Sequence, residues 1–495
     1  MISSTPEWIA RSVSRLRTAA PAADKVGDKL AKAALDKTVT DVVAKVAVPR
    51  STHERLQATL RRGQEALSPR ALRRLLADLQ EVVAPQVSEI EGGRRAQVVA
   101  EWYAKAEPEE RRDMWLLMCE QFAPDATRFK SARQRYEAAA GTAEEGQAEI
   151  SLRRALVSPR TRLLQRFSAF PEGMRFLVDM RAEILPLLKA DKRLLPLDAE
   201  LEHLFSTWFD VAFLELRRLS WDSPASLLEK LIKYEAVHDI RSWADLKNRL
   251  DSDRRCYGFF HPRLPNEPLI FVEVALLDKI SSSITPLLDE AAAPVDITRA
   301  TTAIFYSISN TQTGLRGVSF GDSLIKHVVE TLTAEFPRLR TFATLSPIPG
   351  FRAWLGKHAG AMLDRLDDKR RSELGRAVGF EPPQATHFLG ALDKALELDA
   401  KSPVRQMLLE CAAYYLGREL QEGKPADPVA RFHLGNGARV ERLNWAGDPS
   451  SKGQKQSYGL MVNYLYDLKR IDKHRSLLAQ GKVPVSGDID SLCRD

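Results

Sequence analysis

Apolar residues recur at helical spacing through the first part of the chain. From Ser51 onward, Leu, Val, Trp and Phe side chains return every three or four positions, with polar residues between them. The spacing predicts helices over residues 72–82, 98–103, 114–122, 176–188 and 194–219. We therefore expect a helical domain over residues 51–192, preceded by a variable lead-in over residues 1–50. Its apolar stripes serve either as a core or as an interface with copies of the same chain.

The pattern changes to alternation in the second half of the chain. Ile270, Val272 and Val274 alternate with other residues after a proline-rich turn, as in a β-strand. The expected strands are residues 269–277, 304–308 and 340–345, and the expected helices between them are residues 280–287 and 324–332. This order predicts a mixed sheet in a second domain over residues 193–495. The expected fold class is therefore α + α/β, with a helical bundle domain first and a mixed-sheet domain second.

A glycine-containing loop separates the strand at 304–308 from the helix at 324–332. Such a loop presents backbone N–H groups at a helix N-terminus, where the helix dipole also favours an anion, so the loop suits a phosphate. It lacks the Gly-Lys-Ser/Thr ending of a P-loop and the three-glycine spacing of dinucleotide folds. The candidate binding residues are Arg316, Gly317, Val318, Ser319, Phe320, Gly321 and Asp322.

Two later segments combine turn residues with reactive side chains. Ser346 opens the sequence Ser-Pro-Ile-Pro-Gly, in which two prolines and a glycine fix the backbone around one hydroxyl. His433 precedes the pair Asn436-Gly437, which is typical of a hairpin turn and places the histidine beside a predicted hairpin. Between them, residues 354–366, 384–396 and 407–416 have helical spacing. After the turn, a return strand is expected through Val440, Leu443 and Trp445.

Composition and charge narrow the class of protein. The chain has 495 residues, of which 44% are hydrophobic and 28% charged, as in an ordinary globular protein of more than one domain. Its net charge of +7 is spread among interleaved acids and bases, so we expect no nucleic-acid partner. The four cysteines lack the spacing of metal ligands, which predicts no metal site and favours a reducing compartment.

Targeting signals add little to this interpretation. No apolar run reaches the roughly 18 residues of a membrane span, so we expect no membrane association. Residues 1–50 are rich in alanine and basic residues, like a transit peptide, but their four aspartates favour an amphipathic lead-in. The ending Leu-Cys-Arg-Asp is not a peroxisomal signal.

Several phrases of the sequence resemble one enzyme family. FYSISNTQTGLRGVSFGDSLIKHVV, TLSPIPGF, FHLGNGARVERLNWAGD and YGLMVNYLY resemble malonyl-CoA decarboxylases, in this order, and the resemblance extends over about residues 154–467. The loop Arg316-x-x-Ser319-x-Gly321 also resembles the loop with which GNAT-type acyltransferases hold the pyrophosphate of coenzyme A. The resemblance implies a GNAT-like catalytic domain and a helical domain that forms a homo-oligomer, a tetramer or dimer of dimers. It also indicates a bacterial, cytoplasmic form.

The reaction implied by the resemblance converts malonyl-CoA to acetyl-CoA and carbon dioxide. The thioester carbonyl accepts the electrons that remain when carbon dioxide leaves, so no cofactor is required and coenzyme A is part of the substrate. The enzyme has to stabilise the enolate oxygen and deliver a proton to C2.

Four side chains receive roles from the resemblance. His433 is the expected proton donor, and Ser346 is expected to hydrogen-bond the malonyl group as proton acceptor or orienting residue. Tyr466 is expected to hold the histidine or the thioester oxygen, and Ser307 to face the substrate. The residues alone favour a structural interpretation, with His433 as a hydrogen-bonded strand residue and Ser346 as a turn residue, and only the resemblance favours the catalytic pair. Some family members carry an acid at the position of Ser319, placed to contact the catalytic histidine, and serine cannot supply that charge.

Two other functions remain open at this stage. An acyl-CoA-dependent N-acyltransferase would share the loop and would turn over only with an amine acceptor. A non-catalytic acyl-CoA-binding scaffold would bind the coenzyme without consuming it. The presence of both Ser346 and His433 argues against the scaffold, since coenzyme binding alone requires neither.

Overall fold

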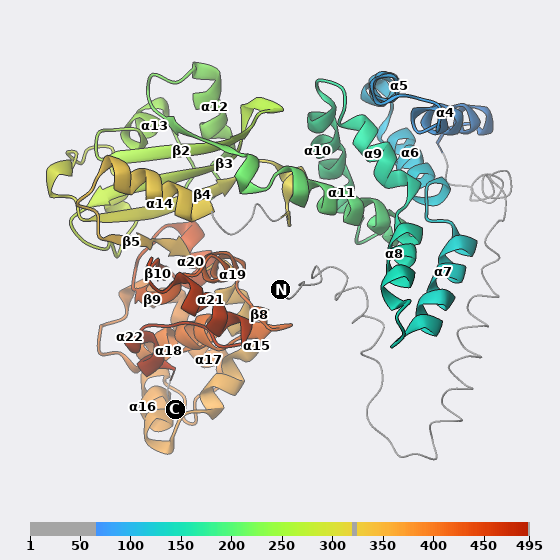
Figure 1. Ribbon diagram of the computed structural model, residues 1–495. Helices are drawn as coiled ribbons and strands as arrows, with labels where there is room; N and C mark the ends of the chain where they lie inside the picture. The colour runs from blue at the N-terminus through green and yellow to red at the C-terminus, as the bar shows by residue number, and fades with distance from the viewer. Residues whose placement is uncertain (1–65, 319–323, 494–495) are drawn as a thin grey trace, which may run out of the picture. The chain divides into compact units, whose positions relative to one another are not determined.

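The computed structural model describes residues 66–318 and 324–493 (Figure 1). The helical region expected before the sheet is confirmed, and the lead-in over residues 1–50 lies outside the described residues. The α-helices before the first strand are α4 (Pro69–Val82), α5 (Glu89–Lys105), α6 (Pro108–Gln121), α7 (Ala126–Ala139), α8 (Glu145–Leu156), α9 (Pro159–Phe167), α10 (Gly173–Ile184) and α11 (Leu195–Trp208). In the part of the chain that the structure describes, no helix is long and apolar enough to cross a lipid bilayer.

One compact unit contains the described residues up to Ala77 together with residues 106–123. Its buried carboxylate, Asp113 of α6, accepts hydrogen bonds from the backbone N–H groups of Ala66 and Leu67, each at 2.9 Å. These bonds satisfy donors that precede α4 and so fix the start of that helix.

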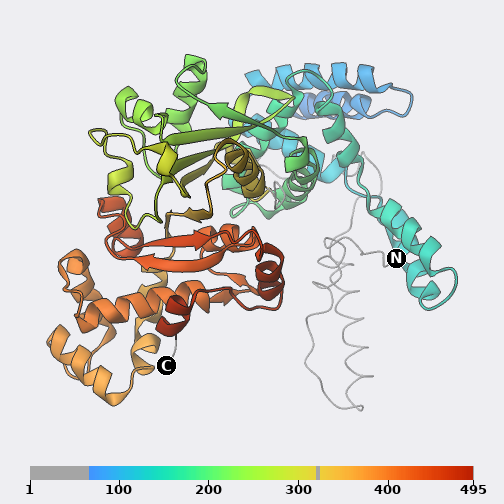
Figure 2. The same cartoon turned by 60° about the vertical axis from the view of Figure 1, so that its left-hand side comes forward.

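The other unit comprises residues 78–105 and the chain from Pro124 onward, and it contains the sheet. Eight strands lie in the order β1-β2-β3-β4-β5-β10-β6, and β9 pairs with β10 (Figure 2). The pair β4 and β5 is parallel, and the other pairs are antiparallel. The strands are β1 (Glu215–Leu219), β2 (Arg254–His261), β3 (Leu264–Leu277), β4 (Thr302–Asn310), β5 (Thr341–Thr344), β6 (Ser346–Pro347), β9 (Arg439–Asn444) and β10 (Met461–Leu465). The mixed sheet expected from the sequence is confirmed.

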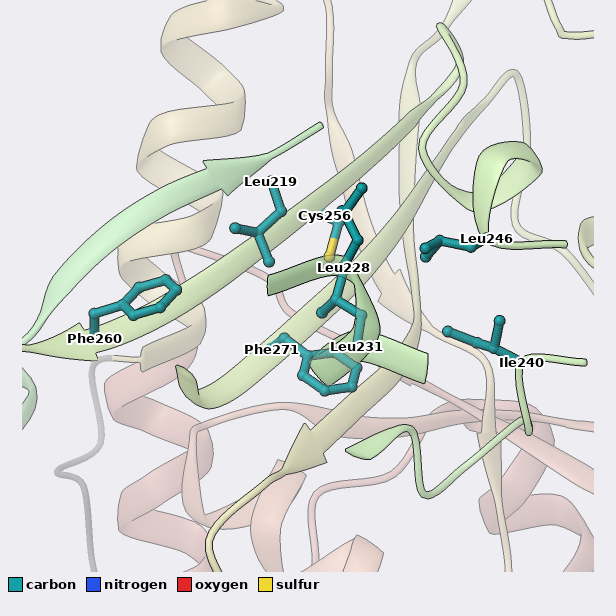
Figure 3. Packing of buried hydrophobic residues seen from close by; sticks show 8 residues of the cluster. All are labelled: Leu219, Leu228, Leu231, Ile240, Leu246, Cys256, Phe260 and Phe271. Carbon is teal, nitrogen blue, oxygen red and sulfur yellow. The ribbon is translucent and has the colours of Figure 1, made fainter. Parts of the chain in front are cut away.

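Helices cover both faces of the first three strands. On one face, α12 (Ala225–Tyr234) and α13 (Trp243–Arg249) bury Leu228, Leu231 and Leu246 against strand residues such as Phe271 (Figure 3). Figure 3 shows these side chains gathered between the helices and the strands. On the other face, Arg255 of β2 donates at 2.7 Å to Glu335, the last residue of α14 (Leu324–Glu335). Burial on both faces makes β2 a fully buried strand.

The remaining helices follow the second parallel strand. They are α15 (Phe351–Asp364), α16 (Asp368–Val378), α17 (Ala385–Ala391), α18 (Pro403–Gly417), α19 (Pro428–Gly435), α20 (Ser451–Ser457), α21 (Ile471–Ala479) and α22 (Gly487–Leu492). A short hairpin of β7 (Leu420–Gln421) and β8 (Lys424–Pro425) leads into α19.

The structure corrects three sequence-based expectations. The helix expected over residues 194–219 ends at Trp208, and residues 215–219 form the edge strand β1, because pairing with β2 outweighs the helical propensity of this segment. Only a 3-10 turn, Thr285–Leu287, forms in the expected helix 280–287. His433 lies in the last turn of α19, not beside a hairpin, because Asp427 and Pro428 start a helix there and Gly437, at φ +85°, follows its end.

Candidate active site

The parallel strands β4 and β5 separate partway along their length. Their register runs from Thr302 opposite Thr341 to Phe305 opposite Thr344, and the N–H of Leu345 donates to the carbonyl of Phe305 at 2.9 Å. Beyond this point β4 continues to Asn310. The segment that follows β5 turns away from β4 and forms β6, which pairs with β10. A cavity of about 510 Å³ lies beside this divergence, with Ser307 and Ser346 in its lining.

A bulge increases the bend of β4 at the same place. The register with β3 passes from Phe305 opposite Val274 to Ser307 opposite Glu273, so Tyr306 is an extra residue in β4. Phe305, Tyr306 and Ser307 all line the cavity. The bulge therefore contributes consecutive side chains to one site.

The cavity brings together the two residues expected to form a pair. Ser346 Oγ lies 3.3 Å from His433 Nε2, and both residues are buried and line the cavity. On the other side of the ring, His433 Nδ1 lies 2.8 Å from Tyr466 Oη. The ring also stacks on Tyr464, with centroids 4.8 Å apart. Both ring nitrogens therefore have a hydroxyl partner, and the ring orientation is fixed.

The segments that carry Ser346 and His433 are joined by Asp427. This carboxylate is fully buried at the N-cap of α19 and accepts from the N–H groups of Val429 and Ala430. Its second oxygen accepts from the N–H of Gly350, at the end of the Ser-Pro-Ile-Pro-Gly segment, at 3.3 Å. One side chain thus starts the histidine's helix and holds the serine's loop against it.

Burial determines the charge of the histidine. Since no opposite charge compensates for desolvation, burial lowers the pKa of His433 to about 3. Burial also raises the pKa of Tyr466 well above its usual value. At neutral pH the ring is neutral, so one of its nitrogens carries a proton and the other accepts a hydrogen bond.

Ser307 lines the cavity but its hydroxyl is already engaged. It donates to the buried carboxylate of Glu235, with both oxygens at 2.8 Å. Glu235 also accepts from the N–H groups of Val237 and His238 and ties this segment to β4. The single hydroxyl proton of Ser307 is thus directed away from the cavity, which leaves its lone pairs for a ligand.

Hydrogen bonds from α10 hold the first residues of the loop after β4 in place. Arg181 of α10 is buried and donates to the carbonyl oxygens of Gly314 and Arg316, at 2.7 and 3.0 Å. Gly317, at φ +81°, has a backbone conformation that favours glycine. Arg316 and Gly317 are exposed, and Val318 lines the cavity. The other expected loop residues, Ser319, Phe320, Gly321 and Asp322, lie outside the described residues.

Asp427, Glu235 and Arg181 were not predicted from the sequence. Only Asp427 carried a local signal, since Asp followed by Pro is typical of a helix start. The other two act across long sequence separations. Among the residues that the structure describes, no group of three or more His, Cys, Asp or Glu side chains is placed to hold a metal ion.

The cavity holds a buried, neutral histidine against a serine hydroxyl, an arrangement suited to an enzyme of acid–base chemistry, and comparison with known proteins identifies the family. The malonyl-CoA decarboxylase C-terminal domain matches residues 212–495, and the malonyl-CoA decarboxylase N-terminal domain matches residues 122–209. The chain belongs to the malonyl-CoA decarboxylase family.

Individual relatives agree with this assignment. The mitochondrial malonyl-CoA decarboxylase of Mus musculus is 38% identical over 361 residues, which cover 70% of this chain and 73% of that protein. The crystal structure of malonyl-CoA decarboxylase from Cupriavidus metallidurans is 44% identical, with a TM-score of 0.72, and covers 86% of this chain and all of that one. The structure from Rhodopseudomonas palustris is 40% identical, with a TM-score of 0.73, over 85% and 99% of the two chains.

Proposed function

We propose that this protein decarboxylates malonyl-CoA to acetyl-CoA and carbon dioxide in the cavity beside β4 and β6. The observation that carries the proposal is the contact of His433 with Ser346 in the wall of that cavity. Arg431 is the one permanently charged side chain among the described lining residues, and its positive charge suits an anionic substrate. Membership of the family supplies the substrate class.

The reaction begins with the carboxylate held out of the plane of the thioester carbonyl. The bond between C2 and the carboxylate carbon breaks, its electrons form the enolate, and carbon dioxide leaves. His433 then gives its Nε2 proton to C2. A neutral imidazole suffices as the acid, because the carbon of a thioester enolate is a stronger base than the imidazolate that remains. Solvent returns a proton to the ring, so one proton is consumed in each turnover.

The other site residues support these two steps. Ser346 orients the Nε2 side of the ring, and its 3.3 Å separation is long enough for substrate to displace the contact. Tyr466 is assigned to holding the ring at Nδ1, since its hydroxyl meets the histidine. Ser307 contributes lone pairs to the cavity. Arg316 to Asp322 would bind the coenzyme's pyrophosphate.

Further parts of the proposal concern the whole protein. The enzyme needs no metal or organic cofactor, since the thioester itself accepts the electrons. A homo-oligomer formed through the helical domain of residues 51–192, attached to a catalytic domain of residues 193–495, and a cytoplasmic location stay predictions from the sequence.

The test is release of acetyl-CoA and carbon dioxide from malonyl-CoA by the purified protein, without added metal or amine. We expect turnover that falls by about 10²–10⁴-fold in His433→Gln and in Ser346→Ala, the range typical for loss of a general acid. His387→Gln is the matched control, because His387 lies in α17 and does not line the cavity, and it should retain full activity.

Two results would contradict the proposal. Malonyl-CoA that stays intact while the protein binds coenzyme A would exclude the decarboxylase, and turnover that appears only with an amine would indicate an N-acyltransferase. Full activity in folded His433→Gln would exclude the assigned proton donor.

A further inference from the structure

A second hydroxyl contacts Ser346 in addition to the histidine ring. Thr344 is the last residue of β5 and is fully buried, and its Oγ1 accepts a hydrogen bond from Ser346 Oγ at 2.9 Å. Residues two apart on an extended chain point to the same face, so the two hydroxyls lie side by side. Thr344 does not line the cavity.

The Thr344 hydroxyl is itself held in place by β10. The backbone N–H of Tyr464 donates to Thr344 Oγ1 at 3.0 Å. The carbonyl of Thr344 accepts from Asn463 Nδ2 at 2.7 Å, and Asn463 in turn accepts from Asn444 at 2.8 Å. These buried, mutually satisfied polar groups give the threonine little freedom to turn.

The direction of these bonds determines where the histidine proton lies. A serine hydroxyl has one proton, and here Ser346 donates it to Thr344. Only its lone pairs then face His433, so Nε2 has to be the protonated nitrogen in that contact. Nδ1 is left to accept from Tyr466 Oη, which donates its proton to it.

We propose that Thr344 is a positioning residue that keeps the proton of His433 on Nε2, the nitrogen that faces the cavity. This inference rests on the proposed decarboxylase function, in which that proton is delivered to C2. Without the threonine hydroxyl, Ser346 would turn its proton toward Nε2. The ring would then carry its proton on Nδ1, donate to Tyr466, and present no proton to the substrate.

The experiment compares Thr344→Val, which keeps the shape and removes the hydroxyl, with Thr344→Ser, which keeps the hydroxyl. We expect kcat to fall about 10²-fold or more in Thr344→Val with KM changed less than about threefold, since proton delivery and not binding is impaired. Thr344→Ser should stay within about tenfold of the wild type. Thr302→Val is the matched control, because Thr302 is also a buried strand threonine, on β4, and does not line the cavity.

A direct measurement separates proton placement from general damage. The full-length protein is labelled with ¹⁵N-histidine, and the His433 signal is assigned from its absence in His433→Gln. The ring nitrogen shifts should report the Nε2–H form in the wild type and Thr344→Ser, and the Nδ1–H form in Thr344→Val.

The outcomes distinguish the two proposals. An Nδ1–H ring in the wild type, or an unchanged ring form in folded Thr344→Val, would overturn the role of Thr344, even if the enzyme is a decarboxylase. Absence of malonyl-CoA turnover in the wild type would overturn the proposed function, while the ring measurement still decides the hydrogen-bond direction.

Discussion

At the scale of single residues, Asp427 shows how a helix cap can also organise the candidate active site. An N-cap ordinarily satisfies the first free N–H groups of its own helix. Here the carboxylate also accepts from Gly350 N–H and lies near Tyr415 Oη. Burial raises the pKa of this carboxyl, and the surrounding donors oppose the shift. The relative placement of Ser346 and His433 therefore depends on a residue that contacts neither.

Asp427→Asn tests this dependence. Asparagine is as good an N-cap as aspartate, but its NH₂ group would replace an oxygen that now accepts from Gly350 and Tyr415. We expect unfolding free energy to fall by about 1–3 kcal/mol, the cost of unsatisfied buried donors, and kcat to fall with it. Urea denaturation and steady-state kinetics measure the two effects.

Asp367→Asn is the matched control. Asp367 is the exposed N-cap of α16 and accepts from Arg370 N–H at 2.8 Å. It should change stability by only a few tenths of a kcal/mol. Equal effects of the two substitutions would show that Asp427 acts only as a helix cap.

Sequence reasoning succeeded for residues that lie within recognisable phrases. The structure brings Ser346, His433 and Tyr466 together as contacts, although their catalytic roles stay predictions. Thr344 is two positions from Ser346 and still gave no signal, because its role depends on Tyr464 far along the chain. In the sequence, a threonine with such a role cannot be distinguished from any other strand threonine, because its hydrogen-bond partners are not known.

At the scale of elements, α10 and the turn at residues 313–315 meet closely. Gly314 lies against the carbonyl oxygen of Val178, so a Cβ there would overlap backbone. Arg175 adds a hydrogen bond to Gln312 at 2.7 Å. The glycine is needed because it allows this approach, on which the bonds from Arg181 depend.

Gly314→Ala should therefore separate the turn from α10. We expect unfolding free energy to fall by about 1–3 kcal/mol or more, as for other overpacked sites, and KM for malonyl-CoA to rise because the following loop is displaced. Thermal unfolding and initial rates measure the two quantities. Gly356→Ala in α15 is the control, because its Cβ would meet no atom within 4 Å, and it should stabilise the protein by about 0.5–1 kcal/mol. A Gly314→Ala protein with unchanged stability and KM would contradict the close contact.

Elements were predicted well where periodicity was long and local. Strand β4, helix α14 and strand β5 follow the expected order of strand, helix and strand. The secondary-structure predictions were wrong where contacts with distant segments determined the local structure. The basic segment Glu215–Leu219 becomes a strand only because β2 is available to pair with it, and Asn436-Gly437 ends a helix because Asp427 had already started one.

At the scale of the whole molecule, buried neutral histidines predict acid sensitivity. Burial lowers the pKa of His238 to about 4, against an ordinary value near 6.5 in the unfolded chain. Between these values the unfolded chain binds a proton that the folded chain does not, so stability falls as pH falls through this window. From pH 6.5 to 4.5 the loss from this one group is about 2–3 kcal/mol.

His238→Gln should remove this part of the pH dependence. Urea midpoints of the wild type and the variant, measured at pH 7 and pH 5, provide the comparison, and the variant should lose less stability on acidification. The carboxyl groups are the same in both proteins, so their effect cancels. Identical pH dependence in the two would contradict a buried, neutral His238.

The bonds from Arg181 to the turn at Gly314 also have a consequence for anyone who shortens this protein. The C-terminal family match begins at residue 212, yet α10, which supports the base of the proposed coenzyme loop, ends at Ile184. A fragment cut at that boundary would keep every side chain proposed to react and lose the arginine beneath the loop. The shortest fragment expected to keep full activity therefore begins before α10. Inhibitors that displace α10 would weaken substrate binding without occupying the pocket.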